Sequence, residues 1–142
     1  MVRISDLLAS KGARVWSIEP EDPVLEALQL MADRYIGALP VMRGAELVGI
    51  VSERDYARKV VLMGRSSSET PVWQIMSAPV VTTSPDDTVD TCMSLMTERR
   101  IRHLPVVNGG NVIGIVSIGD LVKAVIEEQQ QTIDELERYI AG

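Results

Sequence analysis

The sequence predicts an α/β fold built from two similar lobes, and an internal repeat is the first observation that predicts it. Sliding the 142 residues by 65 positions aligns residues 15–60 with residues 80–125 without a gap. Eighteen of the 46 aligned pairs are identical, whereas composition alone would give roughly three or four. Two copies are too few for a solenoid. We therefore expect two lobes that bury their apolar faces against each other about a pseudo-two-fold axis.

The second observation is that each copy has the same order of elements. In the first copy a short β-prone run at 15–18 leads through a Pro/Asp turn to an amphipathic helix, whose apolar residues recur at i, i+3, i+4 and i+7 from Val24. Two strands joined by a turn follow at 39–42 and 47–51, and a second helix begins after Ser52. The second copy repeats these elements at 80–83, 89–96, 104–107, 112–116 and after Ser117. The order strand–helix–strand–strand–helix, found twice, predicts a sheet covered on one side.

The third observation concerns the segments outside the repeat. A polar linker at 64–70 separates the copies, so we place the first repeat at 1–64 and the second at 65–142. Ile4–Leu8 and Trp73–Met76 are predicted to be matching short helices. The last helix is extended, and its apolar face follows a 3–4 spacing through Val122, Ile126, Gln129, Ile133, Leu136 and Ile140. That stripe could pack back on the body or pair with another chain.

Composition narrows the function classes. The formal net charge of −6 argues against non-specific binding to nucleic acid or to an anionic membrane, both of which need a basic face. The single cysteine, Cys92, occupies an apolar helix position and is predicted to be an inert core thiol. With one cysteine and one histidine, a Cys-based zinc site and a His cluster are excluded. We see no signal peptide and no membrane span, and predict a cytoplasmic protein.

A Ser-x-x-Asp sequence begins the second helix of each copy, as Ser52–Asp55 and Ser117–Asp120. One interpretation is a capping box, in which the hydroxyl and the carboxylate satisfy free helix amides. The other is a nucleotide site. A helix N-terminus can hold a phosphate, and a carboxylate in the first turn can accept hydrogen bonds from both ribose hydroxyls. Spacing alone leaves both interpretations open.

A positive cluster precedes the second hairpin, at Arg99, Arg100, Arg102 and His103. Arg99 and Arg100 could simply complement the C-terminal dipole of their helix. Arg102 and His103 alternate faces at the start of an apolar strand, and the Arg fork suits phosphate oxygens. The first copy has Gly37 and Ala38 at the positions of Arg102 and His103. One lobe therefore supplies positive charge, and the other leaves space for a ligand to approach.

Together these motifs identify a resemblance. The pattern Ile36–Val41 followed by Gly49-Ile50-Val51-Ser52-x-x-Asp55 recurs as Ile101–Val106 followed by Gly114-Ile115-Val116-Ser117-x-x-Asp120. It resembles a tandem pair of CBS domains (cystathionine-β-synthase domains, a Bateman module) over nearly the whole chain. The chain is similar in particular to bacterial stand-alone CBS proteins and their plant organelle relatives. The resemblance implies two CBS-type β-α-β-β-α repeats with an extended C-terminal helix.

The resemblance also implies ligands and site residues. CBS pairs bind AMP, ADP or ATP, and some bind NAD(H) or S-adenosylmethionine, in two clefts between the repeats. In the first cleft Asp55 would hold the ribose and Arg102 and His103 would face the phosphate; in the second, Asp120 would hold the ribose, and phosphate would depend on Arg14, Lys11 or helix amides. The remaining residues of the first cleft would be Ile50, Ser52, Arg54, Pro79, Val80 and Val81. Those of the second would be Ile115, Ser117, Gly119, Arg14, Val15, Trp16, Ile36, Gly37 and Ala38.

The expected function is regulatory. The resemblance implies a homodimer, stacked through its helices, that senses energy or redox state through an adenosine ligand and signals to an unidentified protein, with a redox protein suggested by plant relatives. The alternative is a structural or adaptor homodimer in which the Ser-x-x-Asp segments are only helix caps. An enzyme is not expected, because the chain offers neither a nucleophile–base pair nor a metal set. We therefore predict no catalytic residue and no catalytic cofactor.

Overall fold

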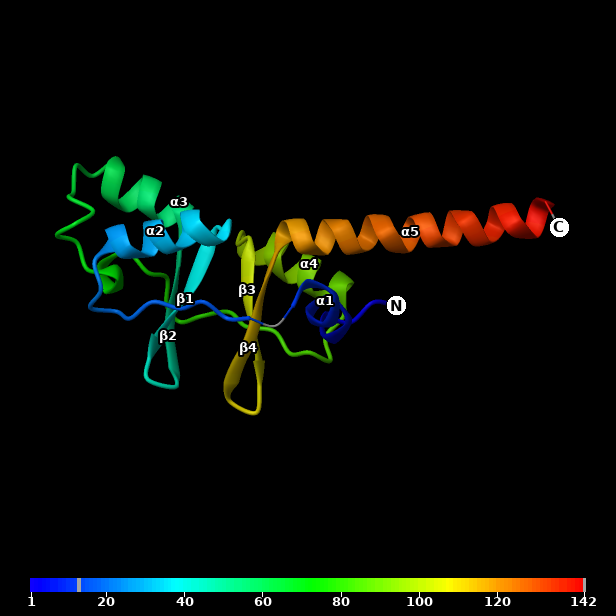
Figure 1. Ribbon diagram of the computed structural model, residues 1–142, viewed down its shortest axis with the longest axis horizontal. Helices are drawn as coiled ribbons and strands as arrows, with labels where there is room; N and C mark the ends of the chain where they lie inside the picture. Colours follow the sequence, from blue (N-terminus) through cyan, green and yellow to red (C-terminus); the bar gives the residue numbers. More distant parts are fainter. Residues whose placement is uncertain (13, 142) are drawn as a thin grey trace. The chain divides into compact units, whose positions relative to one another are not determined.

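A computed structural model describes residues 1–12 and 14–141 of the chain. They form two compact units, one made of residues 15–81 and the other of residues 1–14 together with 82–142 (Figure 1). The N-terminal segment thus packs with the second repeat, and the segment that precedes the second repeat packs with the first. The repeat boundaries 1–64 and 65–142 describe the sequence and stay a prediction.

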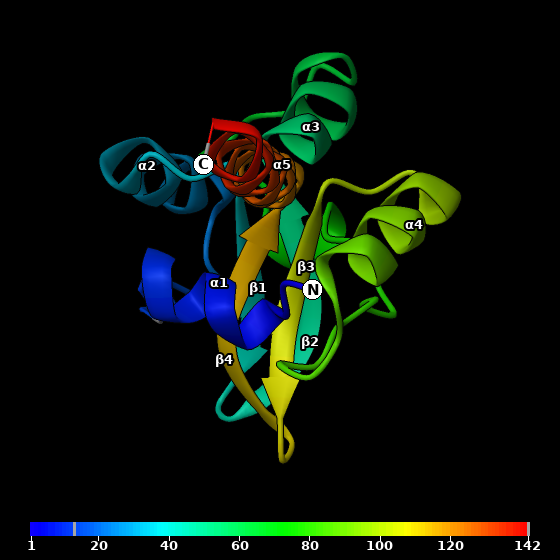
Figure 2. The same cartoon turned by 90° about the vertical axis from the view of Figure 1, so that its right-hand side faces the viewer.

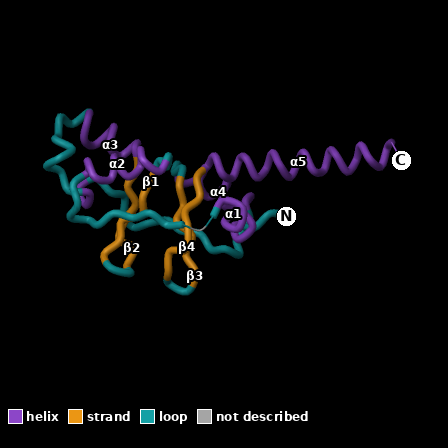
Figure 3. Tube along the Cα trace, in the orientation of Figure 1, coloured by secondary structure: helices purple, strands orange, loops and turns teal. Residues whose placement is uncertain are grey.

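The unit of residues 15–81 carries one helix–hairpin–helix repeat. Its elements are helix α2 (Val24–Arg34), strands β1 (Ala38–Arg43) and β2 (Glu46–Ser52), helix α3 (Glu53–Tyr56), its π-helical continuation η1 (Ala57–Val61), and the 3-10 turn η2 (Val72–Gln74). β1 and β2 form an antiparallel hairpin with an irregularity between Val41 and Met42 (Figure 3). The second helix was predicted correctly, but it changes from α to π geometry after Tyr56.

The other unit repeats this arrangement. Its elements are α1 (Ile4–Lys11), α4 (Val89–Arg99), β3 (His103–Asn108), β4 (Asn111–Ser117) and the long helix α5 (Ile118–Ala141) (Figure 2). β3 and β4 pair in the same register as β1 and β2, with the irregularity at the matching place, between Val106 and Val107. The predicted α/β repeat and the extended C-terminal helix are confirmed.

The first strand predicted for each repeat is much shorter in the structure. Ile18 makes only an isolated parallel bridge to Val41, and Thr83 makes the equivalent bridge to Val106. These bridges lie at the last residue of each predicted strand, and residues 15–17 and 80–82 before them form no strand. Each described sheet is therefore a two-stranded hairpin.

The core of each unit is aliphatic, as the lack of Phe requires. In the unit of residues 15–81, Met31 from α2 packs with Leu39, Val41 and Val51 from the hairpin, and all four are almost fully buried. Cys92 is fully buried at the matching face of α4, as predicted. Burial raises the pKa of its thiol, and this outweighs the hydrogen bond to Thr83, so the thiol stays protonated.

Each hairpin is closed by a short helical segment that lies against a glycine. In one unit α1 covers β4, and a Cβ at Gly114 would lie 2.6 Å from Cδ2 of Leu8. In the other, the segment after η2 covers β2, and a Cβ at Gly49 would collide with the sulfur of Met76. A larger residue at either position would force the neighbouring Leu8 or Met76 side chain to shift, because that side chain occupies the space of the Cβ.

Candidate functional site

The first candidate site begins where β2 passes into α3. The hydroxyl of Ser52 accepts a hydrogen bond from the Asp55 N–H (3.2 Å), and Asp55 Oδ2 accepts from the Ser52 N–H (2.9 Å) and hydroxyl (3.0 Å). The Glu53 N–H donates to the carbonyl of Gly37 (3.1 Å), which fixes the start of β1 beside the helix. The predicted capping box is therefore present, and it brings Gly37 and Ala38 next to the acid.

A lysine completes the surroundings of Asp55. Lys59 lies one turn later and places Nζ 3.2 Å from Asp55 Oδ1, while the same Nζ donates to the carbonyl of Ile75 (2.8 Å). The Asp55 side chain is only 15% exposed. Its charge is thus held in a half-buried position by a cation and two donors from Ser52, which keeps a negative acceptor ready at the helix start.

The second candidate site has the same cap at the start of α5. Asp120 Oδ2 accepts from the Ser117 N–H (2.8 Å), and the Asp120 N–H donates to the Ser117 hydroxyl (3.1 Å). The Ile118 N–H donates to the carbonyl of Arg102 (2.8 Å), which occupies the place that Gly37 has in the other unit. This contact brings Arg102 and His103 beside the start of α5 and Asp120. The sequence prediction assigns the same two residues to the phosphate of the cleft that contains Asp55, and that assignment stays a prediction.

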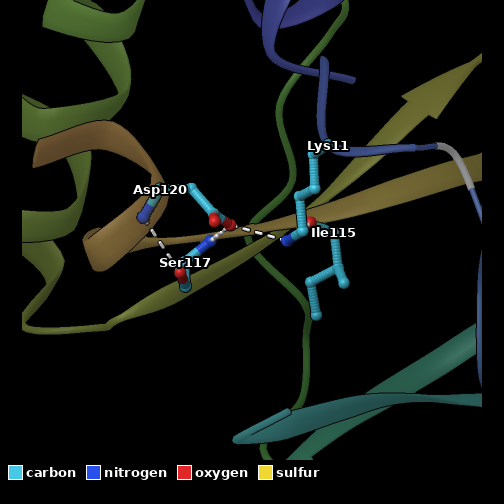
Figure 4. A network of polar contacts seen from close by, with 4 residues as sticks. All are labelled: Lys11, Ile115, Ser117 and Asp120. Carbon is cyan, nitrogen blue, oxygen red and sulfur yellow. Dashed lines mark hydrogen bonds and ion pairs between the residues drawn. The ribbon is translucent and has the colours of Figure 1, made fainter. Parts of the chain in front are cut away.

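The cation of the second site comes from a distant part of the chain. Lys11, the last residue of α1, places Nζ 2.6 Å from Asp120 Oδ2 and donates to the carbonyl of Ile115 (2.8 Å) (Figure 4). The sequence had suggested Lys11 only as one source of charge for phosphate. Because Lys11 lies outside the ungapped repeat, comparing the two copies could not assign it to the acid.

Electrostatics confirm that these groups act on one another. Burial disfavours the charged form of Asp120, but hydrogen bonds from Lys11 and Ser117 together hold the pKa of its carboxyl below the usual value. Burial also lowers the pKa of His103, and the nearby Lys11 and Arg102 lower it further against the opposing charge of Asp120. His103 is therefore mostly neutral at pH 7 and can donate or accept a hydrogen bond there.

The predicted site residues are divided between the two units. The unit of residues 15–81 holds Val15, Trp16, Ile36, Gly37, Ala38, Ile50, Ser52, Arg54, Asp55, Pro79, Val80 and Val81, and the other holds Arg14, Arg102, His103, Ile115, Ser117, Gly119 and Asp120. Within each unit the acid, the serine and the hairpin residues come together. Each predicted cleft includes residues of both units, so the composition of the clefts stays a prediction.

The structure adds one contact that the sequence did not indicate. The guanidinium of Arg34, near the end of α2, lies 3.8 Å from the centre of the Trp16 ring, a cation–π distance. Trp16 was predicted to border the second cleft. The seventeen residues between them contain no pattern that would pair them, and the contact forms only because the chain folds Trp16 back against the end of α2.

Within the described residues, no group of three or more His, Cys, Asp or Glu side chains is arranged to hold a metal ion. No helix in the same part of the chain is long and apolar enough to cross a membrane.

Two hairpins, each followed by a helix that starts with a capped and cation-paired Asp, define a tandem-repeat α/β module. A family model of the CBS domain matches residues 4–62 and 72–127, and the chain belongs to the CBS-domain family. Proteins of this family are generally regulatory modules and commonly bind adenosine ligands.

Known relatives agree with this assignment. The mitochondrial CBS domain-containing protein CBSX3 of Arabidopsis thaliana is 41% identical over 98% of this chain and 72% of its own length. The CBS domain-containing protein YhcV of Bacillus subtilis is 35% identical over 83% of this chain and 84% of its own. A solved structure from Burkholderia ambifaria, described as a putative signal-transduction protein with CBS domains, is 49% identical and superposes with a TM-score of 0.86, covering 90% of this chain and 96% of that one.

Proposed function

We propose that the protein is a non-catalytic regulatory module that binds an adenosine nucleotide at each Ser-x-x-Asp helix start and signals energy or redox state to a partner protein. The observation that carries the proposal is the repeated half-buried acid, Asp55 and Asp120, each held at a helix start by a Ser and a Lys. A carboxylate so placed accepts hydrogen bonds from ribose hydroxyls, as acids do in dinucleotide-binding folds.

The unequal charge of the two units supports a phosphorylated ligand. Lys11, Arg102 and His103 gather around Asp120 in one unit, whereas Gly37 and Ala38 leave space beside Asp55 in the other. In the proposed first cleft Asp55 binds the ribose and Arg102 and His103 face the phosphate. Ile50, Ser52, Arg54, Pro79, Val80 and Val81 complete that cleft.

The proposed second cleft has Asp120 as its ribose acid, and its phosphate contacts depend on Lys11 and Arg14. Because Lys11 is already paired with Asp120, a nucleotide there must either displace this lysine or use it as a phosphate contact. Its other residues are Ile115, Ser117, Gly119, Val15, Trp16, Ile36, Gly37 and Ala38. The ligand of either cleft is AMP, ADP or ATP, or else NAD(H) or S-adenosylmethionine.

The remaining features of the proposal follow from the family and from composition. We propose a cytoplasmic homodimer that binds neither nucleic acid nor membranes, consistent with its net negative charge. Its regulated partner is a protein, with a redox protein suggested by the plant relatives. Ligand binding would bias the partner through a change in shape or rigidity.

The competing function is an adaptor homodimer in which the Ser-x-x-Asp segments only cap helices. The capping boxes at Ser52 and Ser117 favour this alternative as far as they go. The two functions can be separated by measuring nucleotide binding, because a protein whose Ser-x-x-Asp segments only cap helices would bind no nucleotide.

Calorimetric titration with AMP, ATP and NADH, together with thermal unfolding, separates the two. We expect a nucleotide to raise the melting temperature, since a ligand of the native state must stabilise it. Asp55→Ala should remove one binding event and Asp120→Ala the other. Asp6→Ala is the matched control, because Asp6 also caps a helix through its carboxylate but lies at the start of α1.

The adaptor function is favoured if no nucleotide shifts the melting temperature and all three variants lose only about 1 kcal/mol of capping energy. Mass spectrometry of small molecules released from freshly purified protein would then name the ligand or exclude one.

A further inference from the structure

The outer half of α5 has no partner within its own unit. The buried residues of this helix are Leu121 and Ala124, in its first two turns. From Ile126 to Ala141 every residue is exposed, and the helix extends past α1 and α4 of the same unit (Figure 1). A 24-residue helix is thus anchored at one end only.

The exposed half is not uniformly polar. One face of the helix follows the 3–4 spacing of a coiled coil, with five apolar side chains and one polar side chain, Gln129. We call this line the α5 seam: Val122, Ile126, Gln129, Ile133, Leu136 and Ile140. The exposed fractions of its apolar members run from 40% for Val122 to 82% for Ile140. A mainly apolar line of this length, about 27 Å at 1.5 Å per residue and interrupted only by Gln129, indicates a surface that another helix covers.

The charges of α5 indicate which kind of partner covers it. Glu127, Glu128, Asp134 and Glu135 lie away from the seam and make the polar face acidic. A helix that lies on a membrane surface instead carries Lys and Arg on its polar face. A second copy of the same helix supplies a matching apolar line, and its charges complement this one in a single orientation.

That orientation is antiparallel. Lys123 and Glu137 occupy equivalent positions beside the seam, two heptads apart. When two α5 helices run in opposite directions with Ile126 against the second copy's Leu136, each Lys123 lies opposite the second copy's Glu137, so that two ion pairs form. In a parallel pair the neighbours across the seam would be Val125 with Gln130 and Thr132 with Glu137, which form no ion pair.

We propose that the outer halves of α5 from two copies of this chain pair as a short antiparallel coiled coil along the α5 seam. The pairing brings Ile126 of each copy against the second copy's Leu136, and Ile133 of each copy against the second copy's Gln129 at the middle of the seam. It does not depend on a nucleotide, so it stands or fails independently of the proposed regulatory function.

Disulfide trapping in the full-length protein tests both the pairing and its direction. Ile126→Cys and Leu136→Cys are made as separate variants, one with a size tag, and are oxidised alone and mixed. An antiparallel pair places residue 126 against residue 136, within the 4.4–6.8 Å that a disulfide usually spans between Cα atoms. Two copies of residue 126 would then lie about 15 Å apart along the axis. We expect the mixed disulfide only.

Three controls make the result decisive. Gln131→Cys lies on the opposite face of α5 and should give no disulfide, and the native Cys92 is buried. Adding Ile133→Glu to the mixed pair should abolish the cross-link, whereas adding Gln131→Glu, which brings the same charge outside the seam, should leave it. Both substitutions lie on the exposed half of the helix, so circular dichroism should show both variants folded.

A charge exchange gives a second measurement. Lys123→Glu or Glu137→Lys alone should lower the yield of the mixed disulfide, and the double variant should restore it. The proposal would be overturned if Ile126→Cys or Leu136→Cys formed disulfide-linked dimers when oxidised alone. It would also be overturned if the mixture of the two variants formed no disulfide.

Discussion

The two helix starts carry the same Ser-x-x-Asp sequence and the same cap, but they obtain their lysine in different ways. Asp55 pairs with Lys59, one turn further along its own helix, whereas Asp120 pairs with Lys11 from the other end of the chain. The first pair is set by local helix geometry. The second exists only when α1 has packed on β4. The same motif is thus locally determined in one unit and depends on tertiary structure in the other.

The residues beside each acid also differ, in size and in charge. Gly37 occupies in one unit the place that Arg102 occupies in the other, and Ala38 corresponds to His103. Besides its lysine, Asp55 has the small neighbours Gly37 and Ala38, whereas Asp120 has Arg102 and His103. Three measurements can test how far the two units are equivalent in packing, in capping and in charge.

The largest effect is expected where the helical segments close the hairpins. Gly114→Ala would press a Cβ into Leu8, and Gly49→Ala would press one into Met76. Overpacking of this kind costs about 1–3 kcal/mol, to be measured as the free energy of unfolding by urea titration. Since methionine is unbranched and adapts easily, we expect Gly49→Ala to cost less. A cost below about 0.5 kcal/mol for both would show that neither contact closes its hairpin tightly.

A smaller effect is expected from the acids themselves. Asp120→Asn removes the charge that Lys11 and Ser117 stabilise, and should cost about 1 kcal/mol of unfolding free energy at pH 7. Because folding lowers the pKa of Asp120, its stabilising contribution is complete above the unfolded-state value of 3.8 and is lost as the pH falls through the lower folded value.

The difference in unfolding free energy between wild type and Asp120→Asn should therefore shrink between pH 5 and pH 2. Urea titrations at several pH values measure it. Comparison with Asp120→Asn isolates this acid from Asp87, whose pKa is also lowered, first by its hydrogen bond with Thr83. A difference independent of pH would contradict the ion pair.

The third effect is measured on the titration of His103 rather than on stability. This is the only histidine of the chain, so its proton resonances report one site. Lys11→Met should raise the pKa of His103, because it removes a cation that opposes protonation. Asp120→Asn should lower it, because the carboxylate favours the charged imidazole.

Lys59→Met provides the matched control for that titration. It removes the equivalent cation from the unit that does not contain His103, so the His103 pKa should stay where it is. Equal shifts from Lys11→Met and Lys59→Met would show that His103 senses overall charge rather than the local group.

Much of this architecture could be predicted from the sequence. The repeat placed the hairpins and helices, and the Ser-x-x-Asp spacing placed both caps, because strand alternation and helix capping are local properties. The ion pair of Lys11 and the stacking of Arg34 on Trp16 could not be predicted, since both depend on how distant segments pack. The predicted first strands at 15–18 and 80–83 are reduced to single bridges at their last residues, because a β-prone run becomes a strand only where a neighbouring strand pairs with it.

The packing of α1 on β4 has a consequence for how the molecule is made. Leu8 is synthesised early, yet the glycine it covers, Gly114, follows about a hundred residues later. Residues 15–81 are in effect an insertion within the other unit. They can acquire their hairpin and its closing segment while the rest of the chain is still on the ribosome, because nascent domains fold as units. The unit that holds both chain ends cannot be completed until β4 and its Gly114 have been synthesised.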